Sequence, residues 1–442
     1  MVLSAAAGLT ACGGGGGDGG LTPITNADPC SINGQKQFVL DNMRFWYLWN
    51  DRLPANVNLD AYATPQDLLA FLSSFSPDNG SGQPVDTFSF INTVEADQQF
   101  FGEGKFEGFG FNSRFVAAND LRLSRVFTDS PAFRAGLRRG QRILALNGRT
   151  VDQIEAAEGV GAVFGANSTI EFLMRRQDGS EFPAIVTVDI VTIDPVPQWR
   201  IIPGAGGQNI GYLELSTFIS TASAELDTAF AEFQQQGVRS LILDLRYNGG
   251  GLVSIAELLG DYIDGSGAAG LVFSKTLFNA DRGPDNNSEA LFQNIANSLD
   301  VDNLVVIATR GTASASELVA NGLVTDATVT IVGDNTFGKP VGQIGLEFCE
   351  QLLRPTAFQT VNSLDFGDFF GGLPVDCPAA DDLNVAVGAD ADPNLVAALA
   401  FLETGSCPVV SLPGVAGKPT DGFEPPRPEL RGPPWREYAD AY

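Results

Sequence analysis

The length, composition and charge of this chain exclude several classes of function before any motif is considered. Its 442 residues are too many for one hydrophobic core, so two to four domains are expected. A net charge of −27 at pH 7 argues against nucleic-acid binding, which needs a basic surface. The absence of histidine excludes Ser-His-Asp triads, Cys-His pairs and most zinc sites. A hydrolase built from this chain must therefore take its base from lysine, from a carboxylate or from metal-bound water.

The amino-terminal segment has the pattern of a targeting signal. Residues 2–11 are small and apolar, and they run into Cys12 and a glycine tract at 13–17. Leu9-Thr10-Ala11-Cys12 resembles the bacterial lipoprotein signal, whose cysteine is lipidated and becomes the new amino terminus. No basic residue precedes the apolar run, which departs from that pattern, and a Gly-rich tail with an incidental cysteine is the alternative. We expect residues 1–30 to be a lipoprotein-type signal and tether, with the protein on the periplasmic side of a bacterial cell envelope and bound to the membrane only through its lipid.

Residues 31–104 are expected to form a helical amino-terminal domain. Aromatic and aliphatic side chains are concentrated at 38–49 and again at 68–72. Such clusters are more often hydrophobic core than cofactor site, because apolar side chains at helical spacing pack inward.

Residues 105–190 differ from the helical segment before them, because they contain short β-like runs separated by turns. Their motifs are Gly108-Phe109-Gly110-Phe111, Ser130-Pro131-Ala132, Ala135-Gly136-Leu137 and Ile143-Leu144-Ala145-Leu146-Asn147-Gly148. This series resembles a PDZ domain, and an ordinary β domain with a hairpin is the alternative. The resemblance implies that backbone N–H groups of residues 108–111 hold the terminal carboxylate of a peptide, while the adjacent strand edge pairs with its main chain.

Residues 200–407 are expected to form an α/β core. Apolar strand patterns alternate with helical ones, which implies a sheet covered by helices. The predicted strands span 210–218, 240–245, 304–308 and 329–332, and the predicted helices span 224–235, 252–263, 315–323 and 392–402. The segment 408–442 is rich in proline and glycine and is expected to be a loosely ordered tail.

Four of the five cysteines fall in the body of the chain: Cys30, Cys349, Cys377 and Cys407. An even number suits an oxidising compartment, and no C-x-x-C motif suggests a redox or zinc site. Four cysteines allow three pairings, and buried free thiols are a further alternative. We expect Cys349–Cys377 to close the excursion at 350–376 and Cys30–Cys407 to join the two ends of the body.

The segment Thr312-Ala313-Ser314-Ala315-Ser316-Glu317 carries the candidate nucleophile. It follows an apolar strand and opens a predicted helix, whose first N–H groups and positive dipole end favour a developing oxyanion. Ser314 at this junction is the expected nucleophile, and the N–H of Ala315 is an expected oxyanion donor. The alternatives are that Ser314 only caps the helix, or that Ser316 is the nucleophile.

Lys339, in Thr336-Phe337-Gly338-Lys339, is the candidate base. A serine hydroxyl needs a base to attack an amide, and without histidine the candidate is lysine. Free lysine has a pKa near 10.4, so burial in an apolar pocket would be needed to supply a neutral amine. The alternative is an ordinary surface charge.

A third segment, residues 244–251, reads Asp-Leu-Arg-Tyr-Asn-Gly-Gly-Gly. It takes a buried strand through three glycines into a helix, a turn that exposes consecutive N–H groups. The carboxyl end of a strand is also where open α/β sheets place ligands. No Lys-Ser/Thr follows and the G-x-G-x-x-G spacing is missing, so phosphate binding is not favoured. Asp244 and Arg246 are expected to hold the turn by an ion pair.

These three motifs, in this order behind the PDZ-like region, resemble the carboxyl-terminal processing peptidases, or tail-specific serine proteases, over residues 35–405. The resemblance implies Ser314 as nucleophile, Lys339 as base and Gln343 as the residue that orients the lysine. It implies that the N–H groups of Gly250 and Ala315 form the oxyanion hole. The fold it implies is a multidomain α/β plus β protein, with a helical cap, a PDZ-like β domain and a crotonase-like or ClpP-like α/β protease core.

The family pattern is not matched everywhere. Thr312 replaces a serine, Pro340 follows the lysine where glycine is commoner, and Gly249 stands where proline often occurs. None of these changes removes a catalytic group.

The resemblance implies a serine endopeptidase that cuts near the carboxyl termini of proteins or peptides with unstructured ends, without cofactor or metal. A non-catalytic lipoprotein that binds peptides or apolar ligands, and an esterase with the same dyad, are the competing hypotheses.

Overall fold

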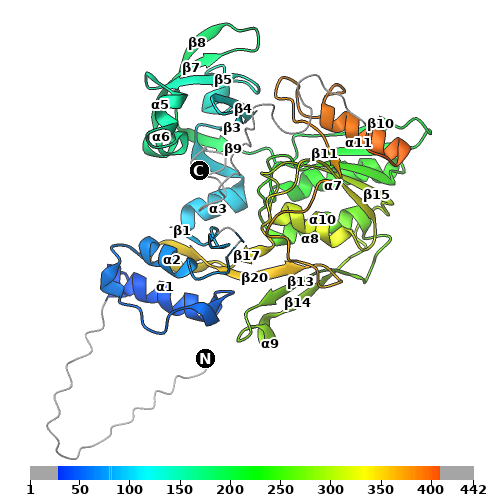
Figure 1. Cartoon of the computed structure of the whole chain (residues 1–442). Helices are drawn as coiled ribbons and strands as arrows, with labels where there is room; N and C mark the ends of the chain where they lie inside the picture. The colour runs from blue at the N-terminus through cyan, green and yellow to red at the C-terminus, as the bar shows by residue number, and fades with distance from the viewer. Residues whose placement is uncertain (1–27, 79, 81, 409–442) are drawn as a thin grey trace, which may run out of the picture.

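The computed structural model describes residues 28–408 except 79 and 81 (Figure 1). Cys12 and the predicted tail from residue 409 onwards lie outside the described residues. The described part has a helical amino-terminal region, a β domain and an α/β core, which confirms the predicted fold class of multidomain α/β plus β. None of its helices is long and apolar enough to cross a lipid bilayer.

The amino-terminal region is built from helices with clear capping signals. Helix α2 begins with a capping box, in which Thr64 and Asp67 bond each other's backbone N–H groups, and Pro65 occupies its first turn. Apolar side chains of α1 and α2 pack together in one buried cluster. The elements are α1 (Ile32–Trp46), η1 (Asn50–Arg52), η2 (Leu59–Ala61), α2 (Pro65–Ser73), β1 (Phe90–Thr93) and α3 (Val94–Glu103).

This region shares a sheet with a distant part of the chain. Strand β1 pairs antiparallel with β19 (Gln351–Arg354), which pairs with β18 (Leu346–Phe348). Phe348 and Leu353 of this hairpin are buried in the cluster of α1 and α2. No sequence pattern predicted the shared sheet, because the pairing joins segments more than 250 residues apart.

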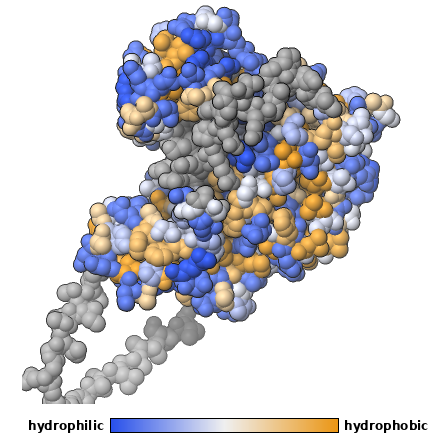
Figure 2. Space-filling view, in the orientation of Figure 1, coloured by the Kyte–Doolittle hydropathy of each residue, from blue (hydrophilic) through white to orange (hydrophobic). Residues whose placement is uncertain are grey.

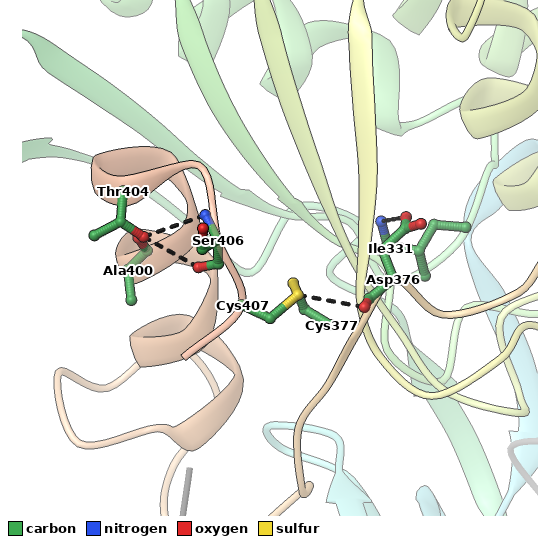
Figure 3. Close-up of a disulfide and its surroundings, with 7 residues drawn as sticks. All are labelled: Ile331, Asp376, Cys377, Ala400, Thr404, Ser406 and Cys407. Carbon is green, nitrogen blue, oxygen red and sulfur yellow. Dashed lines mark hydrogen bonds between the residues drawn. A yellow bond between two sulfur atoms is a disulfide. The ribbon is translucent and has the colours of Figure 1, made fainter. Parts of the chain in front are cut away.

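The predicted disulfide pairing is wrong. The structure pairs Cys30 with Cys349, with a Cα–Cα distance of 5.5 Å. It pairs Cys377 with Cys407, with a Cα–Cα distance of 5.3 Å (Figure 3). The β18–β19 hairpin carries Cys349 out of the core to the start of α1, where Cys30 lies. Cys377 stays in the edge strand β21 (Cys377–Pro378), next to the place where the chain arrives after α11 (Pro393–Thr404).

The β domain has a five-strand path in the order β3-β4-β5-β7-β8, with β3 at one edge. Its core contains Phe109, Phe111, Phe164 and Phe172. A separate pair, β2 with β9, lies where the chain enters and leaves the domain. The elements are β2 (Lys105–Gly108), β3 (Phe111–Ala117), β4 (Asp120–Val126), α4 (Pro131–Arg134), β5 (Arg142–Leu146), β6 (Arg149–Thr150), α5 (Val151–Glu155), α6 (Val160–Ala166), β7 (Thr169–Arg175), β8 (Glu181–Thr187) and β9 (Asp189–Thr192).

The core is a six-stranded sheet in the order β10-β11-β12-β15-β16-β21, parallel from β11 onwards. Residues of α7, α8 and α10 pack on one face, and residues of α11 pack on the other. The elements are β10 (Gln198–Pro203), β11 (Asn209–Glu214), α7 (Ala222–Gln235), β12 (Ser240–Asp244), α8 (Val253–Asp264), β15 (Asn303–Ala308), α10 (Ala315–Leu323) and β16 (Thr328–Gly333).

A second sheet lies beside the core, in the order β14-β13-β20-β17. Its strands are β13 (Val272–Phe278), β14 (Ser288–Leu291), β17 (Val341–Gln343) and β20 (Thr356–Val361), with α9 (Gly283–Asn286) between the first two. None of these four strands was among those predicted from the sequence. Figure 2 shows that the face in view mixes hydrophilic and apolar residues, with hydrophilic ones prominent on the β domain at the top.

Candidate active site

The three motifs singled out in the sequence meet at one edge of the core sheet. They follow β12, β15 and β16, which are adjacent and parallel, so their carboxyl ends lie side by side. Main-chain hydrogen bonds join the loops: Ala313 N–H donates to Asn248 O at 3.1 Å, and Phe337 N–H donates to Thr312 O at 2.9 Å. The site is therefore assembled by backbone contacts between loops that are far apart in the sequence.

Ser314 occupies a strained turn at the start of α10. Its φ of 56° and ψ of −116° place a non-glycine residue at positive φ, which costs about 1–3 kcal/mol. Such strain persists only where the surroundings over-determine it, and it is typical of a serine turned sharply from strand to helix. Ser314 remains partly exposed, whereas Ser316 is fully buried and donates its hydroxyl to Asn248 O at 2.9 Å. These contacts favour Ser314 over Ser316 as the residue that a substrate can reach.

Gly250 lies directly against the serine. A Cβ atom at this position would be 2.7 Å from Ser314 Cβ and 2.9 Å from Ala315 N, and the φ of Gly250 is +104°. Both facts require glycine here. The N–H of Gly250 donates to Asn248 Oδ1 at 2.9 Å, so it is not free in this conformation. Among the described residues, none accepts a hydrogen bond from the N–H of Ala315.

Lys339 follows β16 and is partly buried. Its Nζ lies 4.9 Å from the centre of the Phe88 ring, a cation–π distance. The side-chain amide of Gln343 donates from Nε2 to Phe88 O at 3.0 Å. Phe88 therefore contacts both Lys339, the expected base, and Gln343, the residue expected to orient it, although Phe88 belongs to the amino-terminal region.

Phe88 is held by a buried carboxylate. Asp86 Oδ1 accepts from Phe88 N–H at 3.0 Å and from Thr356 Oγ1 at 2.9 Å, which ties the amino-terminal region to β20. The Phe88 ring also meets Phe337 edge-on, with centroids 6.1 Å apart. Phe88 was not predicted as a site residue, because an apolar residue outside any recognised motif carries no local sign of its contacts.

Glu317 is fully buried between the nucleophile and base loops. Its carboxylate accepts hydrogen bonds from the backbone N–H groups of Ser314, Gly338 and Lys339, and from the hydroxyl of Thr336. Burial raises the pKa of Glu317 above its ordinary value, while these four bonds oppose the rise.

An ion-pair network lies beneath the glycine turn. The expected pair is present: Arg246 Nη2 lies 2.5 Å from Asp244 Oδ2. Asp392, at the start of α11, adds a second carboxylate at 2.5 Å from the same nitrogen. Tyr212 donates its hydroxyl to Asp244 Oδ2 at 2.9 Å. Since Arg246 is only 1% exposed, these partners supply the pairing that a buried charge requires.

The β domain touches this turn through Tyr247. Arg139 Nη1 donates to the Tyr247 hydroxyl at 2.8 Å, and that hydroxyl also bonds Asp381. Although burial opposes it, Arg114, Arg139 and Arg246 hold the pKa of Asp381 well below its usual range. The glycine turn is thus in polar contact with the β domain.

The predicted carboxylate-binding loop contributes backbone rather than side chains. Phe109 and Phe111 are each 1% exposed and belong to the core of the β domain. Gly110 has a φ of +84° and packs against Ser130, whose hydroxyl donates to Gly110 O at 3.0 Å. Strand β3 begins at the end of this loop and pairs antiparallel with β4.

Within residues 28–408, apart from 79 and 81, no group of three or more His, Cys, Asp or Glu side chains has the arrangement of a metal site.

Two segments of the chain match domain models of one protease family. Residues 209–362 match peptidase family S41, and residues 34–90 match the peptidase S41 N-terminal domain. The first segment contains all three loops of the site, and the second contains Phe88.

Curated relatives of this chain are named as carboxyl-terminal processing proteases. The chain is 33% identical over 228 residues to the chloroplastic C-terminal processing peptidase of Tetradesmus obliquus, covering 47% of this chain and 46% of the relative. It is 31% identical over 227 residues to the carboxyl-terminal-processing protease of Synechocystis sp., covering 50% of each. The chain spans about half the length of the curated relatives it matches.

Solved structures share the fold. A putative S41 protease from Bacteroides fragilis aligns with a TM-score of 0.65 and 22% identity, covering 84% of this chain and 97% of that one. The photosystem II D1 C-terminal processing protease aligns with a TM-score of 0.52 and 23% identity, covering 83% of this chain and 99% of that one.

Proposed function

Because this chain belongs to peptidase family S41, we propose that it is a serine endopeptidase that uses Ser314 and Lys339 to cut proteins near their carboxyl termini. One observation carries the proposal: a serine at a strained helix start is packed against a glycine turn and joined through Glu317 to the lysine loop. In a chain without histidine, this lysine is the base that the site offers.

The proposed reaction is acyl transfer to water. A neutral Lys339 amine takes the Oγ proton of Ser314 as Oγ attacks the scissile carbonyl carbon. The tetrahedral intermediate collapses to an ester on Ser314, and Lys339 returns the proton to the leaving amine. Water then attacks the ester with Lys339 again as base, which releases the acid product and restores the serine.

The oxyanion is proposed to be held by the N–H groups of Ala315 and Gly250. The N–H of Ala315 lies next to the nucleophile at the positive end of α10. The N–H of Gly250 must leave Asn248 Oδ1, or share its bond, to take part. Gln343 donates from Nε2 to Phe88 O, which leaves its Oε1 to accept a hydrogen bond from the lysine amine.

The β domain is proposed to dock the substrate end as a PDZ-like module. The PDZ-like motifs between residues 108 and 148 support this, because a PDZ domain binds an extended peptide as an added strand at a sheet edge. Backbone N–H groups of residues 108–111 would hold the terminal carboxylate. We place the protein at the periplasmic side of a bacterial envelope, anchored through lipidated Cys12, and its disulfides suit that oxidising compartment.

Cleavage of an unfolded protein by the full chain tests the proposal. We expect wild type to cleave, Ser314→Ala and Lys339→Met to lose cleavage, and Ser316→Ala to retain it. A substrate with an amidated carboxyl terminus should be cut more slowly, because the docking site loses its carboxylate partner. Cleavage that persists in Ser314→Ala would refute the mechanism. Peptide binding without cleavage in wild type would favour a non-catalytic binding protein, and hydrolysis of small esters alone would favour an esterase.

A further inference from the structure

We propose that Glu317 is a positioning residue that sets the spacing between the nucleophile and the base. The inference rests on the proposed Ser314–Lys339 mechanism and goes beyond it, because Glu317 touches neither the substrate nor the reacting atoms. It acts only through the backbone of the two catalytic residues.

A single oxygen of Glu317 binds both residues. Oε2 accepts from Ser314 N–H at 2.9 Å and from Lys339 N–H at 2.8 Å. The two backbone nitrogens can therefore be no farther apart than the sum of these bonds. Nothing in the sequence signals this link, because the two residues lie on separate loops.

The second oxygen fastens the rest of the base loop. Oε1 accepts from Thr336 Oγ1 at 2.5 Å and from Gly338 N–H at 2.7 Å. The Thr336 hydroxyl accepts in turn from Leu373 N–H at 2.6 Å, so its own proton is directed to Glu317. The Glu317 side chain thus binds Thr336 and Gly338, the two ends of the segment that precedes Lys339.

The chemistry of the four partners requires a carboxylate. All four are donors to Glu317, and only an ionised carboxylate offers acceptors on both of its oxygens. An amide of the same shape would turn its NH₂ group towards two of the donors. Because Glu317 is fully buried, a donor that loses its bond to this side chain stays without an acceptor, which is unfavourable.

An ordinary capping role explains only one of these bonds. A glutamate at the third helical position commonly accepts from the N-cap N–H, as Glu317 does from Ser314. Its bonds to the loop of Lys339 serve no helix. A cap alone would affect stability, whereas a spacer would affect the rate of the chemical step.

The test compares Glu317→Gln with Asp67→Asn, which removes the capping-box acid of α2 away from the site. We expect Glu317→Gln to lower kcat about 100-fold or more with KM within about threefold, because displacing catalytic groups by about 1 Å costs on that order. Reaction of Ser314 with a fluorophosphonate probe should slow to a similar extent. Asp67→Asn should lower the melting temperature and leave both rates unchanged.

A milder pair covers the case in which Glu317→Gln does not fold. Thr336→Val removes one of the four donors and should lower kcat about tenfold, while Thr336→Ser keeps the hydroxyl and should retain the wild-type rate. An active wild type whose Glu317→Gln or Thr336→Val variants keep full kcat and labelling would overturn this inference alone. A wild type that neither cleaves nor reacts with the probe would overturn the proposed function together with it.

Discussion

The substitution Gly250→Ala offers the sharpest test of the active-site geometry. The new Cβ would lie 2.7 Å from Ser314 Cβ, roughly 1 Å inside the ~3.5–4.0 Å optimum for two carbon atoms. It would also lie 2.9 Å from Ala315 N, the expected oxyanion donor. The φ of +104° adds about 1–3 kcal/mol of backbone strain for alanine.

The glycine turn cannot relieve this clash by retreating. Gly250 O accepts from Phe218 N–H at 2.9 Å and from the Thr217 hydroxyl at 3.1 Å, which pins the turn from its other side. The displacement must therefore fall on Ser314 and the start of α10. A misplacement of about 1 Å costs roughly 100-fold in rate, and loss of one oxyanion donor costs about 100- to 1,000-fold. We expect kcat of Gly250→Ala to fall by about 100- to 1,000-fold.

The matched control is Gly237→Ala, which follows α7. Gly237 also has positive φ, +65°, but a Cβ there would meet no atom within 4 Å. It should cost about 1 kcal/mol of stability and no activity. Steady-state cleavage of a fluorogenic peptide and thermal unfolding followed by circular dichroism measure both effects. Equal kcat in the two folded variants would refute the assigned geometry.

Three further predictions concern the surroundings of the site. Phe88→Leu removes the ring over the Lys339 amine, a contact that favours the charged amine by about 0.5–2 kcal/mol. The acid limb of the kcat/KM profile should therefore move to lower pH by about 0.4–1.5 units, and an unmoved limb would exclude a role for the ring. Burial and neighbouring aspartates raise the pKa of Asp264 to about 7. Between about pH 4 and pH 7 the folded state therefore holds a proton that the unfolded state has released. The free energy of unfolding should fall as the pH rises from about 4 to about 7. Asp264→Asn should therefore melt higher than wild type at pH 8 and equally at pH 4, and a lower melting temperature at pH 8 would contradict this sign. The double substitution Cys30→Ser/Cys349→Ser opens a covalent loop with a sequence separation of 319 residues. It should lower the free energy of unfolding, measured by urea titration, by about 2–5 kcal/mol. An unchanged midpoint would show that the pairing of β1 with β19 holds these segments together without the disulfide.

The sequence determined the fold class and the candidate chemistry of this protein because both are encoded locally. Strand and helix periods can be recognised within about ten residues, and the absence of histidine leaves lysine as a candidate base. The three motifs also lie directly after strand patterns, which predicts their meeting at one sheet edge. Ser314, Gly250 and Lys339 accordingly lie on loops that the structure brings to that edge.

Tertiary structure alone decided which distant groups complete the site. The disulfide pairing followed from a hairpin that leaves the core to join β1, and the contact of Phe88 with Lys339 followed from the docking of the amino-terminal region. The engagement of the Gly250 N–H by Asn248 and the four bonds of Glu317 likewise depend on loop conformation. Residue type and periodicity predict what is buried, but the convergence of particular donors and acceptors depends on non-local packing, which no local pattern records.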